Sequence, residues 1–243
     1  HRLVLGQDIV NQVDSQLFPR VPEGEINFFG ARGVGSKTVE HRNVVYSTVD
    51  YSTSASFTVS PAVRTTTSFG AQYVHKEIGT TMAQGDNFAA PAVTTVGGAG
   101  TSRASEDFIE NKTLGFYVQQ QVDWRNRVFL TAALRGDGNS AFGSEFRAAY
   151  YPKLSATWVL SDEDFWSFDW VNTLRLRSAW GQAGQQPDVF AALTLYSATV
   201  GPGGAPAITP QTFGNPSLKP EVGDELEIGF DAGMLEERLS ASF

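Results

Sequence analysis

The 243-residue sequence contains no cysteine, so disulfide bonds and cysteine-ligated zinc are excluded within this chain. It has no run approaching about 18 consecutive apolar residues, and no membrane-spanning helix is expected. Charged residues make up only 18%, with 26 acidic against 18 basic side chains and a formal net charge of −8. A nucleic-acid partner would need a basic face, so this balance argues against one.

What the sequence does contain is alternation of apolar and polar residues. A period of two places successive side chains on opposite faces of a β-strand. In one such run the apolar row is Leu114, Phe116, Val118, Val122 and Trp124. Alternation predicts strands over residues 43–60, 63–77, 113–124, 128–137, 148–159, 172–181 and 224–234, with the end of a strand at 1–5 and a further strand beginning at 239.

The connections between these predicted strands are long and short in turn. Residues 6–42, 78–110 and 183–220 are rich in small and polar residues and are expected to be long loops. Tight turns are expected at Ser60-Pro61 and Arg125-Asn126, and a helical turn over 161–168 that begins with a capping box. Up-and-down outer-membrane barrels combine short periplasmic turns with long extracellular loops in this way.

Large aromatic residues lie near the ends of the apolar rows, and they are Trp124, Tyr150, Trp158 and Trp180. Tyr150 and Trp158 are separated by roughly 26 Å at about 3.3 Å per residue, or about 20 Å after a strand tilt near 40°. The spacing predicts an aromatic girdle around a thin apolar band. The expected fold is therefore all-β, and part of an up-and-down antiparallel transmembrane β-barrel.

A second interpretation stays open, because soluble sheets also alternate. A secreted β-sandwich that binds glycans or acts as an adhesin-like module would bury Leu114, Phe116 and Val118 between two sheets. The barrel is favoured because soluble strands peak at about five or six residues, whereas membrane-spanning strands need about nine to eleven.

Charged residues of the late strands fall on the parity opposite to the apolar rows. These residues are Arg175, Arg177, Glu225, Glu227 and Asp231. An arginine facing lipid costs about 2–4 kcal/mol at mid-membrane, whereas charges facing the lumen cost little. The five side chains are therefore expected to form a polar wall of the lumen, with ion pairs if the two strands are neighbours.

No catalytic, cofactor-binding or metal site is expected, and the chain is not expected to be an enzyme. The outer-membrane hydrolase alternative lacks a G-x-S-x-G elbow or other catalytic group. Residues 30–38 nearly match a P-loop, but Ser36 stands where lysine is needed. Asp137, Asn139 and Glu145 lack the spacing of a calcium loop, and turn hydrogen bonds are expected for the first two. The histidines His1, His41 and His75 show no metal-ligand spacing.

Five blocks of sequence occur in a characteristic order in the second half of the chain. They are LRGDGNSAFG at 134–143, YYPKLSATWVLSDEDFW at 150–166, LRLRSAWGQAGQQ at 174–186, GNPSLKPE at 214–221 and ELEIGFDAGMLEERL at 225–239. In order and spacing they resemble the late barrel of the SusC/RagA branch of TonB-dependent outer-membrane receptors.

The resemblance implies a barrel of roughly 22 strands with a plug inside it. It also implies location in the bacterial outer membrane, and active import of oligosaccharides or peptides powered through the TonB complex. The implied partners are outer-membrane lipid and a SusD-like lipoprotein lid. The chain opens at His1 and ends at Phe243 within an alternating run. Residues 1–243 are thus expected to be a partial barrel domain, without the plug.

Overall fold

The computed structural model describes residues 1–22, 24–25, 33–143 and 148–243. Its strands are β1 (Arg2–Phe18), β2 (Ser36–Ser60), β3 (Val63–Phe88), β4 (Ala99–Trp124), β5 (Val128–Asn139), β6 (Ala149–Val159), β7 (Val171–Gln185), β8 (Leu195–Val200), β9 (Pro206–Thr212), β10 (Glu221–Met234) and β11 (Leu239–Ser242). Short 3-10 turns are η2 (Val96–Gly98), η3 (Leu160–Asp162) and η4 (Pro202–Gly204). None of the helices in the described part of the chain has the length and apolar character needed to cross a membrane.

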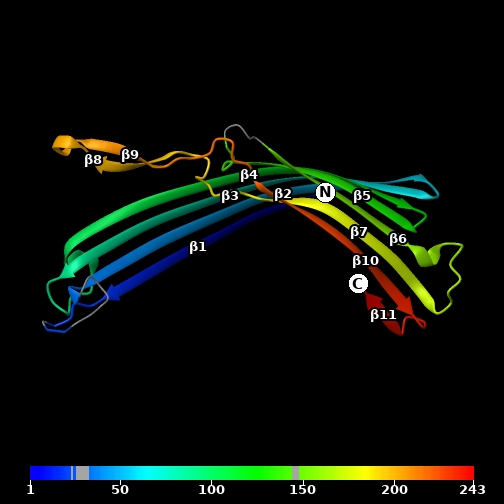
Figure 1. Cartoon of the computed structure of the whole chain (residues 1–243), viewed down its shortest axis with the longest axis horizontal. Coiled ribbons are helices and arrows are strands. Elements are labelled where there is room, and N and C mark those ends of the chain that lie inside the picture. Colours follow the sequence, from blue (N-terminus) through cyan, green and yellow to red (C-terminus); the bar gives the residue numbers. More distant parts are fainter. Residues whose placement is uncertain (23, 26–32, 144–147) are drawn as a thin grey trace. The chain divides into compact units, whose positions relative to one another are not determined.

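Nine of the strands form one sheet in the order β1-β2-β3-β4-β5-β6-β7-β10-β11, so sequential strands are neighbours (Figure 1). The pairs from β4 to β11 are antiparallel, which is the up-and-down arrangement that the sequence predicts. The β8–β9 hairpin is a separate two-stranded sheet inserted between β7 and β10. Within the described ranges the nine-stranded sheet is not closed, and β1 and β11 are its edges.

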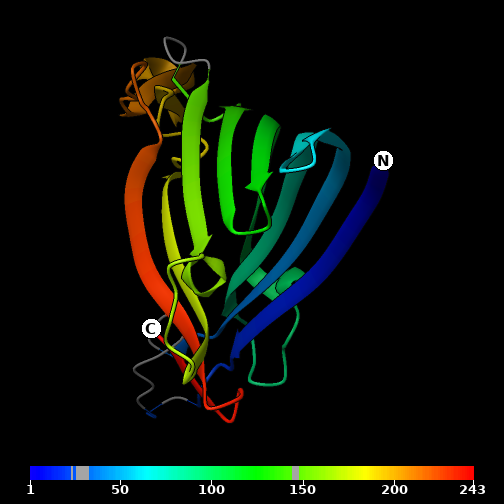
Figure 2. The same cartoon turned by 90° about the vertical axis from the view of Figure 1, so that its right-hand side faces the viewer.

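The chain divides into two compact units, each described by itself. Unit 1 comprises His1–Leu5, Val49–Tyr73 and Lys112–Phe243, and unit 2 comprises Gly6–Thr48 and Val74–Asn111. Strands β2, β3 and β4 contribute residues to both. Figure 2 shows the unit 1 strands β10, β7 and β6 side by side, in red-orange, yellow and yellow-green.

Two of the predicted long loops are wrong over most of their length. The predicted loop at 6–42 contains most of β1 and the start of β2, and the predicted loop at 78–110 contains the end of β3 and the start of β4. These stretches have no alternation of apolar residues because both of their faces carry polar side chains. Backbone pairing needs no such alternation, so the strands continue where the sequence pattern stops.

The third predicted loop and the predicted helical turn also need correction. Within 183–220, β7 extends to Gln185 and the β8–β9 hairpin forms. The helical turn at 161–168 is only the 3-10 turn η3, which begins after Val159 and has no side-chain cap. Glu163 already has extended backbone, with φ −84° and ψ 148°, and its carboxylate accepts hydrogen bonds from Arg127 and Trp158, so the helical turn ends before it.

Both predicted tight turns are confirmed. Arg125 and Asn126 have φ of 53° and 56°, and the Arg127 N–H donates to the Trp124 carbonyl at 3.0 Å, which makes a type I′ turn. The Asn126 N–H also donates to the Asp123 carboxylate at 2.8 Å. At the other turn, the Ala62 N–H donates to the Ser60 hydroxyl at 3.3 Å.

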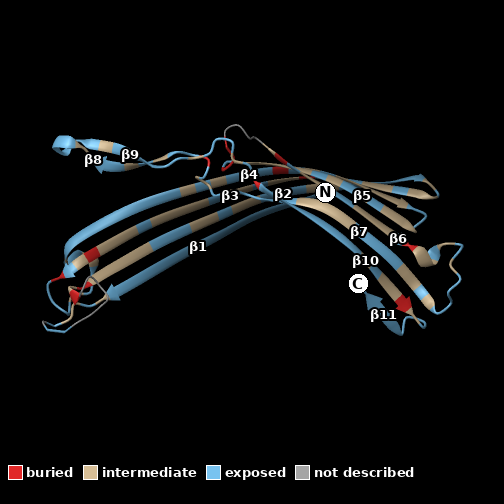
Figure 3. Ribbon diagram, in the orientation of Figure 1, coloured by how far each residue is buried: buried red, intermediate tan, exposed pale blue. Residues whose placement is uncertain are grey.

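Few of the described residues are buried (Figure 3), and the buried apolar ones lie at strand ends or in connections. Leu114, Phe116 and Val118 are 46%, 48% and 50% exposed, so no second sheet covers them. The β-sandwich interpretation is therefore wrong. An exposed apolar face on neighbouring strands is what a membrane wall requires, because lipid takes the place of a packed core.

One buried contact joins two connections of unit 1. The Gly143 N–H donates to the Leu218 carbonyl at 3.2 Å. A Cβ atom at Gly143 would lie 1.9 Å from the Pro216 carbonyl oxygen, so no larger residue fits without displacing the backbone. The β5–β6 connection and the β9–β10 connection are thereby held against each other.

Candidate functional site

Strand register separates the sheet from β4 to β10 into two faces by residue parity. Thr131 lies opposite Ser155, and Arg177 lies opposite both Thr157 and Gly229. Odd-numbered residues pair only with odd-numbered residues in the β4–β5, β5–β6 and β6–β7 ladders, and in the β7–β10 ladder up to Gly233. We call the odd-numbered side the polar face and the even-numbered side the apolar face.

All five charged residues predicted for the lumen wall lie on the polar face. Arg175 lies opposite Asp231, and the β7 and β10 strands that carry the five charges are neighbours, as the sequence hypothesis requires. The Arg177 guanidinium forms an ion pair with Asp231 at 3.1 Å. Asp231 also accepts a hydrogen bond from the Ser242 hydroxyl at 2.9 Å, so this pair reaches β11.

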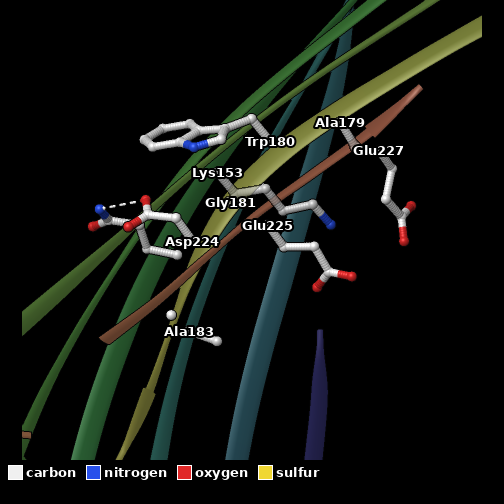
Figure 4. Close-up of a pocket in the computed structure, with 10 residues that line it drawn as sticks. Lys153, Ala179, Trp180, Gly181, Ala183, Asp224, Glu225 and Glu227 are labelled. Atoms are coloured by element: carbon white, nitrogen blue, oxygen red, sulfur yellow. Dashed lines mark hydrogen bonds between the residues drawn. The ribbon is translucent and has the colours of Figure 1, made fainter. Parts of the chain in front are cut away.

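A hollow of about 500 Å³ lies beside these charges on β7 (Figure 4). Gly181 lies opposite Lys153 on one side and Glu225 on the other. Because glycine has no side chain, the cationic and anionic groups flank an open position on the strand. Lys153, Glu225 and Glu227 project to one side of the strands, and Trp180 projects to the other (Figure 4).

A second ion pair on the polar face was not singled out from the sequence. Arg135 pairs with Asp137 at 2.8 Å and donates to the Gln72 side chain at 2.9 Å. A Cβ at Gly115 would lie 2.1 Å from the Asp137 carboxylate, so glycine provides the room for this pair. The alternation of β5 already placed Arg135 opposite to the apolar row, and that parity was the available signal.

Turn hydrogen bonds were expected for Asp137 and Asn139, and only Asn139 makes one. The Asn139 side-chain oxygen Oδ1 accepts a hydrogen bond from the Ala141 N–H at 2.7 Å, which is local turn chemistry, and the Asn139 side-chain nitrogen donates to the Thr113 hydroxyl at 2.6 Å. Asp137 instead pairs with Arg135. Glu145 and the first residues of the near P-loop, 30–32, lie outside the described residues, and Ser36 begins β2.

The predicted girdle aromatics all lie on the apolar face. Trp124 and Trp158 are at the same end of the sheet, where Trp158 lies opposite Val128 just beyond the Arg125-Asn126 turn. Tyr150 is 65% exposed and lies toward the other end of β6. Trp180 lies opposite Leu154, midway between Tyr150 and Trp158 along β6. The girdle itself stays a prediction.

The even-numbered row has a polar exception that is hydrogen-bonded across strands. The Thr67 hydroxyl donates to the Gln120 side-chain oxygen at 2.7 Å, and the Gln120 amide donates to Thr65. A polar group without a partner is costly in an apolar surrounding. These bonds explain how Gln120 can occupy a row that is otherwise mostly apolar.

The connection after β6 is fixed to the sheet by a carboxylate. Glu163 accepts hydrogen bonds from the Trp158 indole at 2.8 Å and from Arg127 at 3.1 Å. Phe165 packs edge-on against Trp158, with ring centroids 6.4 Å apart. The β6–β7 connection therefore packs against the apolar face of the sheet at Trp158.

Comparison with known proteins identifies the family and the fold of this chain. The family model described as TonB dependent receptor-like, beta-barrel matches residues 14–243. TonB-dependent receptor P3 of Formosa agariphila is 24% identical over 152 residues, or 60% of this chain, and P39 of the same organism is 27% identical over 128 residues, or 52%. These matches cover only 15% and 12% of the two relatives.

Solved structures show the same fold. The RagAB peptide transporter structure matches 98% of this chain and 26% of its own with a TM-score of 0.84 at 21% identity, and a closed-closed RagAB state matches 99% and 27% with the same score at 20% identity. The resemblance to SusC/RagA receptors is thereby confirmed. With residues 14–243 matched by the family model, the chain belongs to the TonB-dependent receptor-like β-barrel family of the bacterial outer membrane.

Proposed function

We propose that this chain is part of the barrel wall of a TonB-dependent transporter that imports oligosaccharides or peptides across the outer membrane. The chain spans 12–15% of the curated relatives it matches, so the activity belongs to the whole protein. Residues 1–243 would be one portion of the barrel domain. The family is one of receptors rather than enzymes, and no catalytic step is assigned to the chain.

The observation that carries the proposal is the division of the sheet into a polar and an apolar face. Leu226 and Ile228 on the apolar face of β10 are 65% and 73% exposed, which suits contact with lipid. Glu225 and Glu227 lie on the opposite side of the same strand, which suits contact with water and cargo. The five charged residues predicted from the sequence would then line the lumen.

Two partners follow from the family and belong to the proposal. Energy would come from the inner membrane through the TonB complex, acting on a part of the protein other than this stretch. A SusD-like lipoprotein would cover the extracellular side and deliver the cargo. The structurally similar RagAB complex is described as a peptide transporter and importer, which supports including peptides beside oligosaccharides as cargo.

The test is uptake by cells that carry the full-length protein. We expect labelled oligosaccharide or labelled peptide to accumulate in wild-type cells and not in cells lacking either this protein or TonB. The two cargo arms decide between the substrate classes. If deletion of the protein leaves the uptake of both unchanged, the transport proposal is wrong.

A paired substitution links the uptake to this wall. Changing Glu225 and Glu227 to glutamine removes two charges from the polar face, and the uptake rate is expected to fall at an unchanged outer-membrane level of the protein. The control is Asp224→Asn, on the other face of the same strand, where Gln182 donates to the carboxylate at 2.9 Å. Equal uptake by the double variant and the control would remove these two glutamates from the path.

A further inference from the structure

Unit 2 brings a histidine and two glutamates together from neighbouring strands. His75 and Glu77 lie on β3, and Glu110 lies on β4. The His75 Nε2 atom is 2.8 Å from a Glu110 carboxylate oxygen and 3.3 Å from a Glu77 carboxylate oxygen. Spacing along the chain does not indicate this group, because Glu110 reaches it only through strand pairing.

The separations already resemble those around a bound metal ion. Zinc binds histidine nitrogen at about 2.0–2.1 Å and carboxylate oxygen at about 2.0–2.2 Å, so neighbouring ligands of a tetrahedral ion lie about 3.3–3.5 Å apart. One ligand atom from each of the three side chains falls within 4.8 Å of the others. Small side-chain rotations would therefore be enough to place all three around one ion.

The donor set decides which ion fits. Imidazole nitrogen suits zinc and other first-row transition metals, whereas calcium and magnesium prefer oxygen ligands alone. The two carboxylates supply two negative charges, which would balance a divalent ion beside a neutral imidazole. The exposed fractions are 23% for His75 and 39% for each glutamate side chain, so an ion can enter from solvent and keep a water ligand.

We propose that His75, Glu77 and Glu110 form a binding site for a divalent transition metal, with Zn²⁺ as the representative ion. The metal binds the Nε2 lone pair of a neutral imidazole that carries its proton on Nδ1, and any proton held at Nε2 is released to water. Because the ligands come from β3 and β4, the bound ion joins the two strands within unit 2. The transport proposal does not depend on this site.

The test uses the full-length protein, purified in detergent with a tag that contains no histidine and stripped of metal with a chelator. Zinc bound at equilibrium is measured by dialysis and elemental analysis. We expect wild-type protein to bind one zinc equivalent more than His75→Ala. Glu77→Gln and Glu110→Gln keep the size of the side chain and remove the charge, and each is expected to weaken this equivalent by at least about tenfold, as loss of one ligand interaction would do.

The matched control is His41→Ala, which removes an imidazole elsewhere in unit 2 and is expected to leave the zinc stoichiometry unchanged. Heat-modified migration in gel electrophoresis checks that each variant has a folded barrel. Cobalt(II) absorption gives a second readout, because the spectrum reports nitrogen and oxygen ligation directly. Equal zinc binding and equal cobalt spectra in folded wild-type and His75→Ala protein would overturn the proposal.

Discussion

Glu163 shows how a single side chain fixes the end of this sheet. Its carboxylate is only 16% exposed and accepts hydrogen bonds from Trp158 and Arg127. The neighbouring Asp164 also lies within reach of Arg127, at 3.4 Å, but is 92% exposed. Two adjacent acids that share one arginine therefore differ in how much solvent competes for their charge.

Replacing Glu163 with alanine is expected to lower the free energy of unfolding by about 1–3 kcal/mol, because an indole N–H and a guanidinium lose their acceptor. Asp164→Ala is expected to change it by no more than about 0.5 kcal/mol, as exposed sites usually do. Urea titration of the full-length protein in lipid vesicles measures both. Equal effects of the two changes would show that Glu163 does not hold the connection.

The same residue marks a limit of sequence reasoning. The pattern of Ser161 followed by Asp164 predicted a helix cap, yet the carboxylate that holds the connection is that of Glu163, and its partner Arg127 lies in the turn just before β5. Likewise, the parity of Arg135 was visible in the sequence, but its pairing with Asp137 on the same strand and with Gln72 of β3 depends on strand neighbours. Local patterns carry no information on such partners.

At the scale of a strand, β6 gives the clearest example of a strand with one apolar and one polar face. Leu154 lies opposite Ala132 and Trp180 on the apolar face, and Ser155 lies opposite Thr131 and Ala179 on the polar face. The two residues are adjacent in sequence and lie at nearly the same height in the strand. They differ in the face of the sheet from which their side chains project.

Leu154→Arg should therefore lower the free energy of unfolding by about 2–4 kcal/mol, since a charge in the middle of the lipid is desolvated. Ser155→Arg should be tolerated, because its side chain projects from the polar face. Folding of the two full-length variants into lipid vesicles, followed by heat-modified gel migration, provides the comparison. A greater loss at 155 than at 154 would reverse the assignment of the faces.

Alternation predicted the strands that unit 1 contributes to the nine-stranded sheet well, missed the β8–β9 hairpin, and predicted the strands of unit 2 poorly. Between residues 113 and 181 one face of each strand is apolar, so apolar and polar residues alternate along the sequence with a period of two. Past Tyr73 on β3, the row that held Phe69 continues with His75 and Glu77. A strand with polar residues on both faces has no such signal, although its backbone pairs equally well.

For the whole molecule, the sequential strand order fixes which connections share an end. The connections after β2, β4, β6 and β10 share one end of the sheet, and those after β1, β3, β5 and β7 share the other. The connections after β2, β4 and β10 are short, whereas the β6–β7 connection at 160–170 is longer than the β5–β6 connection at 140–148. Alternation predicted the antiparallel sheet, and five ordered blocks of sequence were enough to predict the family. In the part of the chain that the structure describes, the nine-stranded sheet leaves both of its edges open, as expected for a partial barrel.

The absence of cysteine in this chain allows a direct test of the topology. Thr94→Cys, in the exposed β3–β4 connection, is expected to react with a membrane-impermeant maleimide on intact cells. Asp164→Cys, in the β6–β7 connection, is expected to react only after the outer membrane is permeabilised. Any other cysteines of the full-length protein are first changed to serine. Labelling of Asp164→Cys on intact cells would contradict the orientation.

The contact between Gly143 and the β9–β10 connection has a consequence for how this protein can diverge. Gly143 closes the block LRGDGNSAFG, and Pro216 and Leu218 belong to the block GNPSLKPE. The two sequence blocks are far apart along the chain, but they form a single contact in the structure. A methyl group added at Gly143 would require the backbone at Pro216 to shift. Substitutions in one block are therefore tolerated only together with changes in the other.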